Sequence, residues 1–193
     1  SMKVIKTINI KELEAKPGEK AFGFVDVADT FGSISQLPVG IINGSQPGPT
    51  LLVTAGIHAC EYTGIEAASR LYKKTMPDEL KGALIIITCM NIPALRMRKP
   101  FVVPFDDKNL NRSFPGSPRG SMASRLADLI MKDILPHCTH LIDLHTGAVG
   151  RENLPQIRAT LEGTDSELGE LATAFNAPVI LDTSPRAGTF RMA

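Results

Sequence analysis

Hydrophobic residues are arranged in two different ways along the chain, in uninterrupted runs and at helical spacing, and this difference separates strands from helices. TLLVTAG (50–56) and GALIIITCMNI (82–92) are almost wholly apolar, which is typical of buried strands. Between them, YTGIEAASRLYKK (62–74) repeats its apolar residues at helical spacing and ends on two lysines. A strand, a helix and a second strand in this order predict an α/β unit with parallel strands.

Segments on both sides extend this alternation. Further strands are expected at 3–10, 21–29, 36–44, 139–147 and 177–182. Helices are expected at 121–135 and at 165–175, the second capped by Asp165 or Ser166. We therefore predict an α/β fold, with a mixed, largely parallel sheet and helices on both faces.

Between Pro93 and Gly120 the periodic pattern is lost and prolines recur. We expect a long loop here. A loop of this length inside a compact domain is commonly functional.

Length and charge limit the function. The 193 residues fit one domain, 1–193, in which residues 1–35 form N-terminal strands. A net charge of +1, with 21 basic and 20 acidic residues interspersed, argues against nucleic acid as a partner. Apolar runs fall short of the roughly 20 residues of a membrane span, and no apolar leader is visible. Cys60, Cys89 and Cys138 are too widely spaced for a disulfide framework, which favours free thiols and a cytoplasmic location.

His58, Glu61 and His145 are the candidate metal ligands. His58 and Glu61 are three residues apart just after a predicted strand, and His145 leaves another strand in the same way. Parallel strands bring such ends to one edge of a sheet. Two histidines and one glutamate, with a fourth position left to water, are typical ligands of a catalytic zinc. A structural zinc would need a fourth protein ligand, for which Cys60, His137 and His140 are available.

The long loop carries Asn111 and Arg112, a neutral donor beside a guanidinium that suits a substrate carboxylate. Arg96, Arg98 and Lys99 lie upstream. For Arg96 and Lys99, plain solvation is the simplest interpretation.

Three motifs now stand in order: GIHACEYTG (56–64), NLNRSFPG (109–116) and LIDLHTG (141–147). Together they resemble the zinc carboxypeptidase-like superfamily, and most closely its succinylglutamate desuccinylase/aspartoacylase branch. The likeness runs from about Gln36 to the end of the chain.

The resemblance implies roles for named residues. His58, Glu61 and His145 would bind Zn²⁺, and Asn111 and Arg112 would hold the carboxylate of a small-molecule substrate. An arginine shortly before the clamp polarises the scissile carbonyl in this family. Arg98 fits that place best, with Arg96 as the fallback.

The resemblance also implies residues that orient the ligands. The family often has an acidic residue two positions before the clamp asparagine, where this chain has Asn109. The amide oxygen of Asn109 would then accept the ring N–H of His58. Asp143, two residues before His145, is a further candidate for this role.

The implied function is hydrolysis of an amide bond in a small N-acyl amino acid or related carboxylate. Zinc carboxypeptidase activity and a non-catalytic zinc-binding fragment remain alternatives, and self-association stays open. The resemblance places the general-base glutamate about sixty residues after His145, beyond Ala193. A β-rich cap would follow it. We therefore expect a C-terminally truncated chain that binds zinc and turns over weakly or not at all.

Overall fold

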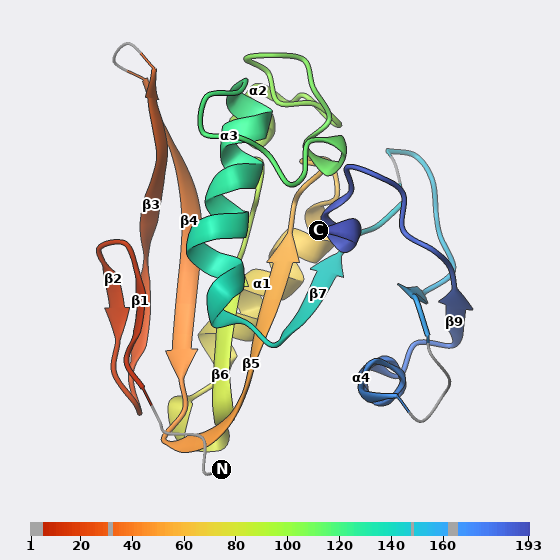
Figure 1. The fold of residues 1–193 in the computed structure, drawn as a ribbon. Coiled ribbons are helices and arrows are strands. Elements are labelled where there is room, and N and C mark those ends of the chain that lie inside the picture. The colour runs from red at the N-terminus through yellow and green to blue at the C-terminus, as the bar shows by residue number, and fades with distance from the viewer. Residues whose placement is uncertain (1–5, 31–32, 148, 162–165) are drawn as a thin grey trace.

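The computed structural model describes residues 6–30, 33–147, 149–161 and 166–193. Its centre is a five-stranded sheet in the order β3–β4–β6–β5–β7, accompanied by the two-stranded sheets β1–β2 and β8–β9 (Figure 1). The strands are β1 (Ile8–Ile10), β2 (Leu13–Ala15), β3 (Lys20–Thr30), β4 (Ser33–Asn43), β5 (Gln46–Ala55), β6 (Lys81–Ile87), β7 (His140–Leu144), β8 (Gln156–Ala159) and β9 (Val179–Asp182).

The central sheet is mixed, as predicted. β4 pairs antiparallel with β3 and β6, whereas β5 pairs in parallel with β6 and β7. The helix α1 (Tyr62–Lys74), predicted at the same residues, connects β5 to β6. The α/β class with a mixed sheet is therefore confirmed.

Helices cover both faces of this sheet, which divides the core into two layers. In β6, Leu84 and Ile86 share a cluster with residues of α1, and Ile85 and Ile87 share one with residues of α3 (Met122–Leu129). This alternation follows from the two-residue period of a strand. Figure 1 shows α1 and α3 on opposite sides of the sheet.

The stretch predicted as one long loop contains two short helices. Asn91 caps α2 (Ile92–Met97) by accepting the N–H of Ala94, and Pro93 fits the first turn because its missing N–H is not needed there. A 3₁₀ turn, η2 (Leu110–Arg112), follows. The prediction of a continuous loop over 93–120 was therefore wrong at both places.

Regular α-helix also ends earlier than predicted after α3. The chain continues as a π turn, η3 (Ile130–Ile134), and a 3₁₀ turn, η4 (Leu135–His137). The remaining 3₁₀ turns are η1 (Pro77–Glu79) and η5 (Phe190–Met192).

Beyond β7, a small unit combines the parallel pair β8–β9 with α4 (Glu167–Phe175) (Figure 1). Ser166 caps α4 by accepting the N–H of Gly169, while Asp165, the other predicted cap, lies outside the described residues. β8 was not expected from the sequence. Its short segment QIRA carries too little pattern to separate it from a loop.

Residues 188–190 return to the five-stranded sheet and the helices that cover it, which together form the central unit. The N–H of Phe114 donates to the carbonyl oxygen of Gly188 over 3.1 Å, and the rings of Phe114 and Phe190 stack at 4.7 Å. Phe190 is 1% exposed and joins the main core cluster. Among the described residues, none of the helices is long and apolar enough to cross a membrane.

Candidate metal centre

Two parallel strands deliver the predicted ligands to one edge of the sheet. β5 ends at Ala55 and β7 at Leu144, and these two residues are partners in the strand register. His58 lies in the loop after β5, Glu61 precedes the first turn of α1, and His145 directly follows β7. The three side chains therefore converge although the sequence separates His145 widely from the other two.

Glycines let the backbone pass closely enough for this convergence. Gly56 has a φ of +66°, and a Cβ there would lie 2.8 Å from the sulfur of Cys89. Gly64 in α1 faces Leu144 at the end of β7, where a Cβ would lie 3.3 Å from the backbone oxygen. The glycine framing of the first motif thus has a steric reason.

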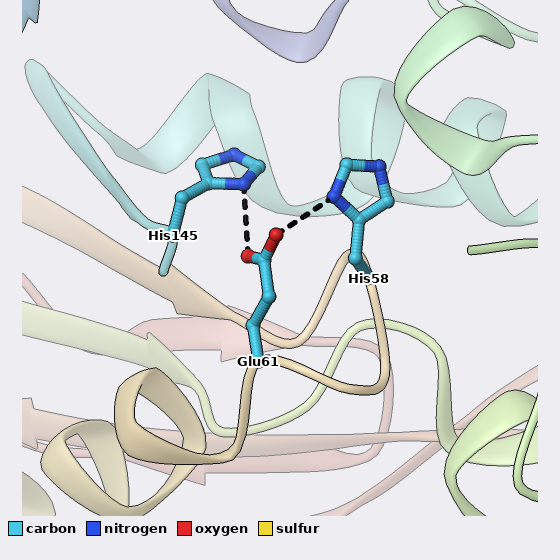
Figure 2. A group of neighbouring side chains, drawn as sticks. All are labelled: His58, Glu61 and His145. Carbon is cyan, nitrogen blue, oxygen red and sulfur yellow. Dashed lines mark hydrogen bonds and ion pairs between the residues drawn. The ribbon is translucent and has the colours of Figure 1, made fainter. Parts of the chain in front are cut away.

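Glu61 lies between the two histidines (Figure 2). Its Oε1 is 3.0 Å from Nδ1 of His58, and its Oε2 is 2.9 Å from Nδ1 of His145. One ligand atom from each residue lies within 4.8 Å of the others. The structure therefore brings together all three predicted ligands, and both rings present the same nitrogen.

The other ring nitrogens bind the two predicted orienting residues. Nε2 of His58 lies 3.3 Å from Oδ1 of Asn109, and Nε2 of His145 lies 2.8 Å from Oδ2 of Asp143. The same Asn109 oxygen accepts the backbone N–H of Asn111 at 2.9 Å, so it must be an acceptor. Nε2 therefore carries the proton in a neutral ring, which leaves the Nδ1 lone pair for a metal ion.

The environment strongly perturbs two of these groups. Burial raises the pKa of Glu61, but interactions with His145 and His58 outweigh this effect and lower the pKa to about 2. Burial likewise lowers the pKa of His145, but Asp143 and Glu61 outweigh it and raise the pKa to about 10. Without a metal ion, this cluster therefore keeps a carboxylate beside a protonated imidazole at neutral pH.

The residues fit a zinc ion. Two imidazole nitrogens and one carboxylate are the ligand types of catalytic zinc. Within the described residues, Oε2 of Glu61 is buried and has no hydrogen bond of acceptable geometry, despite the nearby His145. The alternatives for a fourth ligand, Cys60, His137 and His140, do not belong to this group. His140 instead pairs with Glu167 at 2.9 Å.

Asn111 and Arg112 lie in η2, two and three residues after Asn109. Oδ1 of Asn111 accepts the backbone N–H of Phe190 at 3.0 Å, which fixes the amide and leaves Nδ2 to donate elsewhere. The guanidinium of Arg112 is exposed and bonds the backbone oxygen of Asn111. The C-terminal segment therefore orients one of the two predicted clamp residues.

The structure gives less support to the carbonyl-polarising arginine. Arg98 ends α2 in a left-handed conformation with φ of 54°, and it is exposed. Its fallback, Arg96, lines a surface groove together with Phe24, Met97 and Phe105. Neither residue contacts the three ligands within the described interactions, so the role of Arg98 stays a prediction.

Sequence reasoning missed three contacts around the site. Thr54 donates to Asp143, Phe190 binds Asn111, and Phe101 packs edge-on against His58 with ring centroids 5.6 Å apart. Each contact joins segments distant in sequence. A local pattern therefore carries no signal for it.

The region of the chain that matches known proteins contains the three motifs. Residues 47–193, which include every predicted ligand, match the succinylglutamate desuccinylase/aspartoacylase catalytic domain. The chain is 35% identical over 153 residues to the N-alpha-acetyl-L-2,4-diaminobutyric acid deacetylase of Halomonas elongata, covering 74% of this chain and 42% of the relative. The resemblance inferred from the three motifs is thus confirmed.

Solved structures of the same family share this fold. The succinylglutamate desuccinylase/aspartoacylase from Rhodobacter sphaeroides superposes with a TM-score of 0.81 at 27% identity, covering 95% of this chain and 54% of that chain. The ectoine utilization protein EutE (DoeB) from Ruegeria pomeroyi, with product bound, superposes with a TM-score of 0.74 at 25% identity, covering 99% of this chain and 59% of that chain. The chain therefore spans about half the length of the relatives it matches.

Proposed function

Because the chain belongs to the succinylglutamate desuccinylase/aspartoacylase family, we propose that it carries the metal-binding half of a zinc-dependent hydrolase for small N-acyl amino acids. The observation that carries this proposal is the convergence of His58, Glu61 and His145, each histidine backed by an acceptor on its far nitrogen. A bound Zn²⁺ would acidify a water molecule and polarise the scissile carbonyl.

The chain's own residues prepare the site for this chemistry. His58, Glu61 and His145 would hold the ion through two nitrogens and one carboxylate, and Asn109 and Asp143 keep both rings in the tautomer that binds metal. Because the described group contains three ligands, a fourth position is left for water or substrate. This arrangement favours a catalytic metal over a structural one.

Substrate binding is assigned to Asn111 and Arg112. With Oδ1 of Asn111 engaged by Phe190, its Nδ2 can donate to a carboxylate, and Arg112 adds a charged planar donor beside it. The deacetylase relative favours an N-acetylated amino acid as the substrate class. Arg98 is proposed to stabilise the developing oxyanion, which requires its exposed side chain to turn toward the metal.

The general base is proposed to lie outside these residues, because the family places it about sixty residues after His145. Of the acidic residues after His145, Asp182 accepts the N–H of Leu161 in the small unit and Glu152 is exposed. We therefore expect residues 1–193 alone to bind zinc and to show little hydrolysis.

Metal analysis tests the centre of this proposal. The purified chain is expected to hold one zinc per molecule, and His58→Ala and His145→Ala are expected to lose it while keeping the wild-type circular dichroism. Stoichiometric zinc in both variants would exclude these ligands.

Hydrolysis tests the rest. A panel of N-acetyl amino acids and their C-terminal amides is incubated with the 193-residue chain and with a form extended by native sequence, at equal zinc loading. The extended form is expected to cleave the free acids. Equal cleavage of the amides would reject the carboxylate clamp, and release of C-terminal residues from peptides would favour the carboxypeptidase alternative.

A further inference from the structure

We propose that Thr54 is a positioning residue of the metal centre: its buried hydroxyl holds the Asp143 carboxylate, which in turn holds the ring of His145. The inference rests on the proposed function, since it takes His145 to be a metal ligand. It adds a residue that lies near the carboxyl end of β5 and bears no metal-binding group of its own.

The contact is short and well defined. Thr54 in β5 and Asp143 in β7 are register partners, and Oγ1 of Thr54 donates to Oδ1 of Asp143 at 2.7 Å. This length is typical of a hydroxyl bound to a charged carboxylate. Oδ2 of the same carboxylate accepts Nε2 of His145 at 2.8 Å. Both oxygens of Asp143 therefore have a partner, and the carboxylate connects the sheet interior to the metal ligand.

His145 depends on this support more than His58 does. The side chain of His145 is 36% exposed, whereas that of His58 is 16% exposed and packs against Phe101. Packing alone therefore restrains the His145 ring less. The terminal torsion of an aspartate is broad, so Asp143 needs a second contact to keep one orientation. Thr54 supplies that contact.

The chemistry of the position supports a functional hydroxyl. Thr54 is fully buried, and its strand neighbours Val53 and Ala55 are buried apolar residues. A buried hydroxyl is costly without a hydrogen bond, and valine has the same shape without this cost. A threonine here is explained by its bond to Asp143.

Zinc affinity tests the proposal. The dissociation constant of Zn²⁺ is measured by chelator competition for the wild-type chain, Thr54→Val, Thr54→Ser and Thr50→Val. Loss of an outer partner of a metal ligand typically weakens binding 10- to 100-fold, so Thr54→Val is expected to weaken it about 10-fold. Thr54→Ser keeps the hydroxyl and is expected to stay close to wild type. Thr50→Val, four residues earlier in β5, controls for a threonine lost from the same strand.

A second measurement separates orientation from packing. In the zinc-loaded chain, the Nε2 proton of His145 is expected to exchange slowly with water and to give an observable imidazole NMR resonance. Thr54→Val is expected to raise its exchange rate. In an Asp143→Ala background, Thr54→Val is expected to cause no further loss of zinc affinity, because its effect passes through Asp143. If Thr54→Val folds poorly by itself, the zinc affinities of Asp143→Ala with and without Thr54→Val still test whether the effect of Thr54 passes through Asp143.

The possible results distinguish failure of the role of Thr54 from failure of the proposed metal centre. Wild-type zinc affinity in Thr54→Val, equal weakening in Thr54→Ser, or additive losses with Asp143→Ala would each overturn the role of the hydroxyl. By contrast, a wild-type chain that binds no zinc, or a His145→Ala variant that still binds it, would reject the proposed metal centre itself.

Discussion

Two parallel strand pairs in this molecule have the same local geometry and very different surroundings. β6, paired with β5, is buried from Gly82 to Ile87 between the layers of α1 and α3. β9, paired with β8, alternates half-buried and exposed residues, and Ile180 is 39% exposed where Ile86 in β6 is fully buried. Backbone pairing alone therefore does not determine how rigidly a strand is held. Packing does, and all three proposed metal ligands lie in segments that follow β5 or β7 of the central sheet.

The largest test of this contrast compares two isoleucine truncations. Ile86→Ala is expected to lower the free energy of unfolding by about 2 to 5 kcal/mol, because it leaves a cavity in a closed core. Ile180→Ala, in the equivalent kind of strand, is expected to cost less than about 1 kcal/mol. Urea unfolding followed by circular dichroism measures both.

Hydrogen exchange gives the control. β9 amides are expected to exchange faster than β6 amides in the wild-type chain, and Ile180→Ala to speed only the former. Similar costs for both variants would show that the small unit is packed as firmly as the central sheet.

A pair of glycines tests whether the C-terminal segment belongs to the central unit. Gly188 and Gly150 both have positive φ, at +75° and +74°. A Cβ on Gly188 would lie 2.7 Å from the backbone oxygen of Arg112, whereas one on Gly150 would meet nothing within 4 Å.

Each alanine substitution costs about 1 to 2 kcal/mol of backbone strain. Gly188→Ala is expected to cost more than Gly150→Ala and also to speed exchange of the Phe190 amide, which binds Asn111. Equal unfolding midpoints and unchanged exchange would mean that the segment is not coupled to Asn111.

The pH dependence of the metal-free chain tests the electrostatics of the central unit. The pKa of His145 rises to about 10 from 6.5, so its contribution is complete below pH 6.5 and is lost as pH rises toward 10. The pKa of Glu61 falls to about 2 from 4.5, so its contribution is present above pH 4.5 and is lost as pH falls toward 2. Stability is therefore expected to be highest between these limits.

Since the His145 side chain is one-third exposed, solvent screening limits the alkaline loss to about 1 kcal/mol. Urea unfolding in the presence of a chelator at pH 6 and pH 9 measures it. His145→Ala should flatten this alkaline decline, and an unchanged decline in that variant would place its origin elsewhere.

The smallest expected effect concerns a link between the two regions. His140 in β7 pairs with Glu167 at the start of α4, but the Glu167 side chain is 81% exposed. Glu167→Gln is therefore expected to change the free energy of unfolding by less than about 0.5 kcal/mol, with only slightly faster exchange in α4. A larger cost would show that this pair anchors the small unit.

Much of the central unit could be predicted from the sequence because its signals are local. α1 begins and ends where apolar periodicity and the terminal lysines place it. The meeting of His58, Glu61 and His145 at one edge of the sheet could be predicted because the segments that carry them follow recognisable strands and because their motifs stand in a familiar order.

Other features could not be predicted because they depend on distant pairing. Thr54 and Asp143 are 89 residues apart, and Asn111 and Phe190 are 79 residues apart. α2 was hidden because Pro93 suggested a break, although proline is well accommodated in a first helical turn. β8 has only four residues, too few to produce a clear alternation.

The register between β5 and β7 has a consequence for folding. Thr54 stands opposite Asp143, and a slip of one residue would place Ile142 or Leu144 there and turn Asp143 to the other face of the sheet. His145, the proposed ligand, would move with it. A zinc ion that binds here would therefore selectively stabilise the native register of β5 and β7. Chains with the native register would bind it, and chains with a shifted register would not. Refolding with and without zinc would then yield different fractions of correctly aligned molecules.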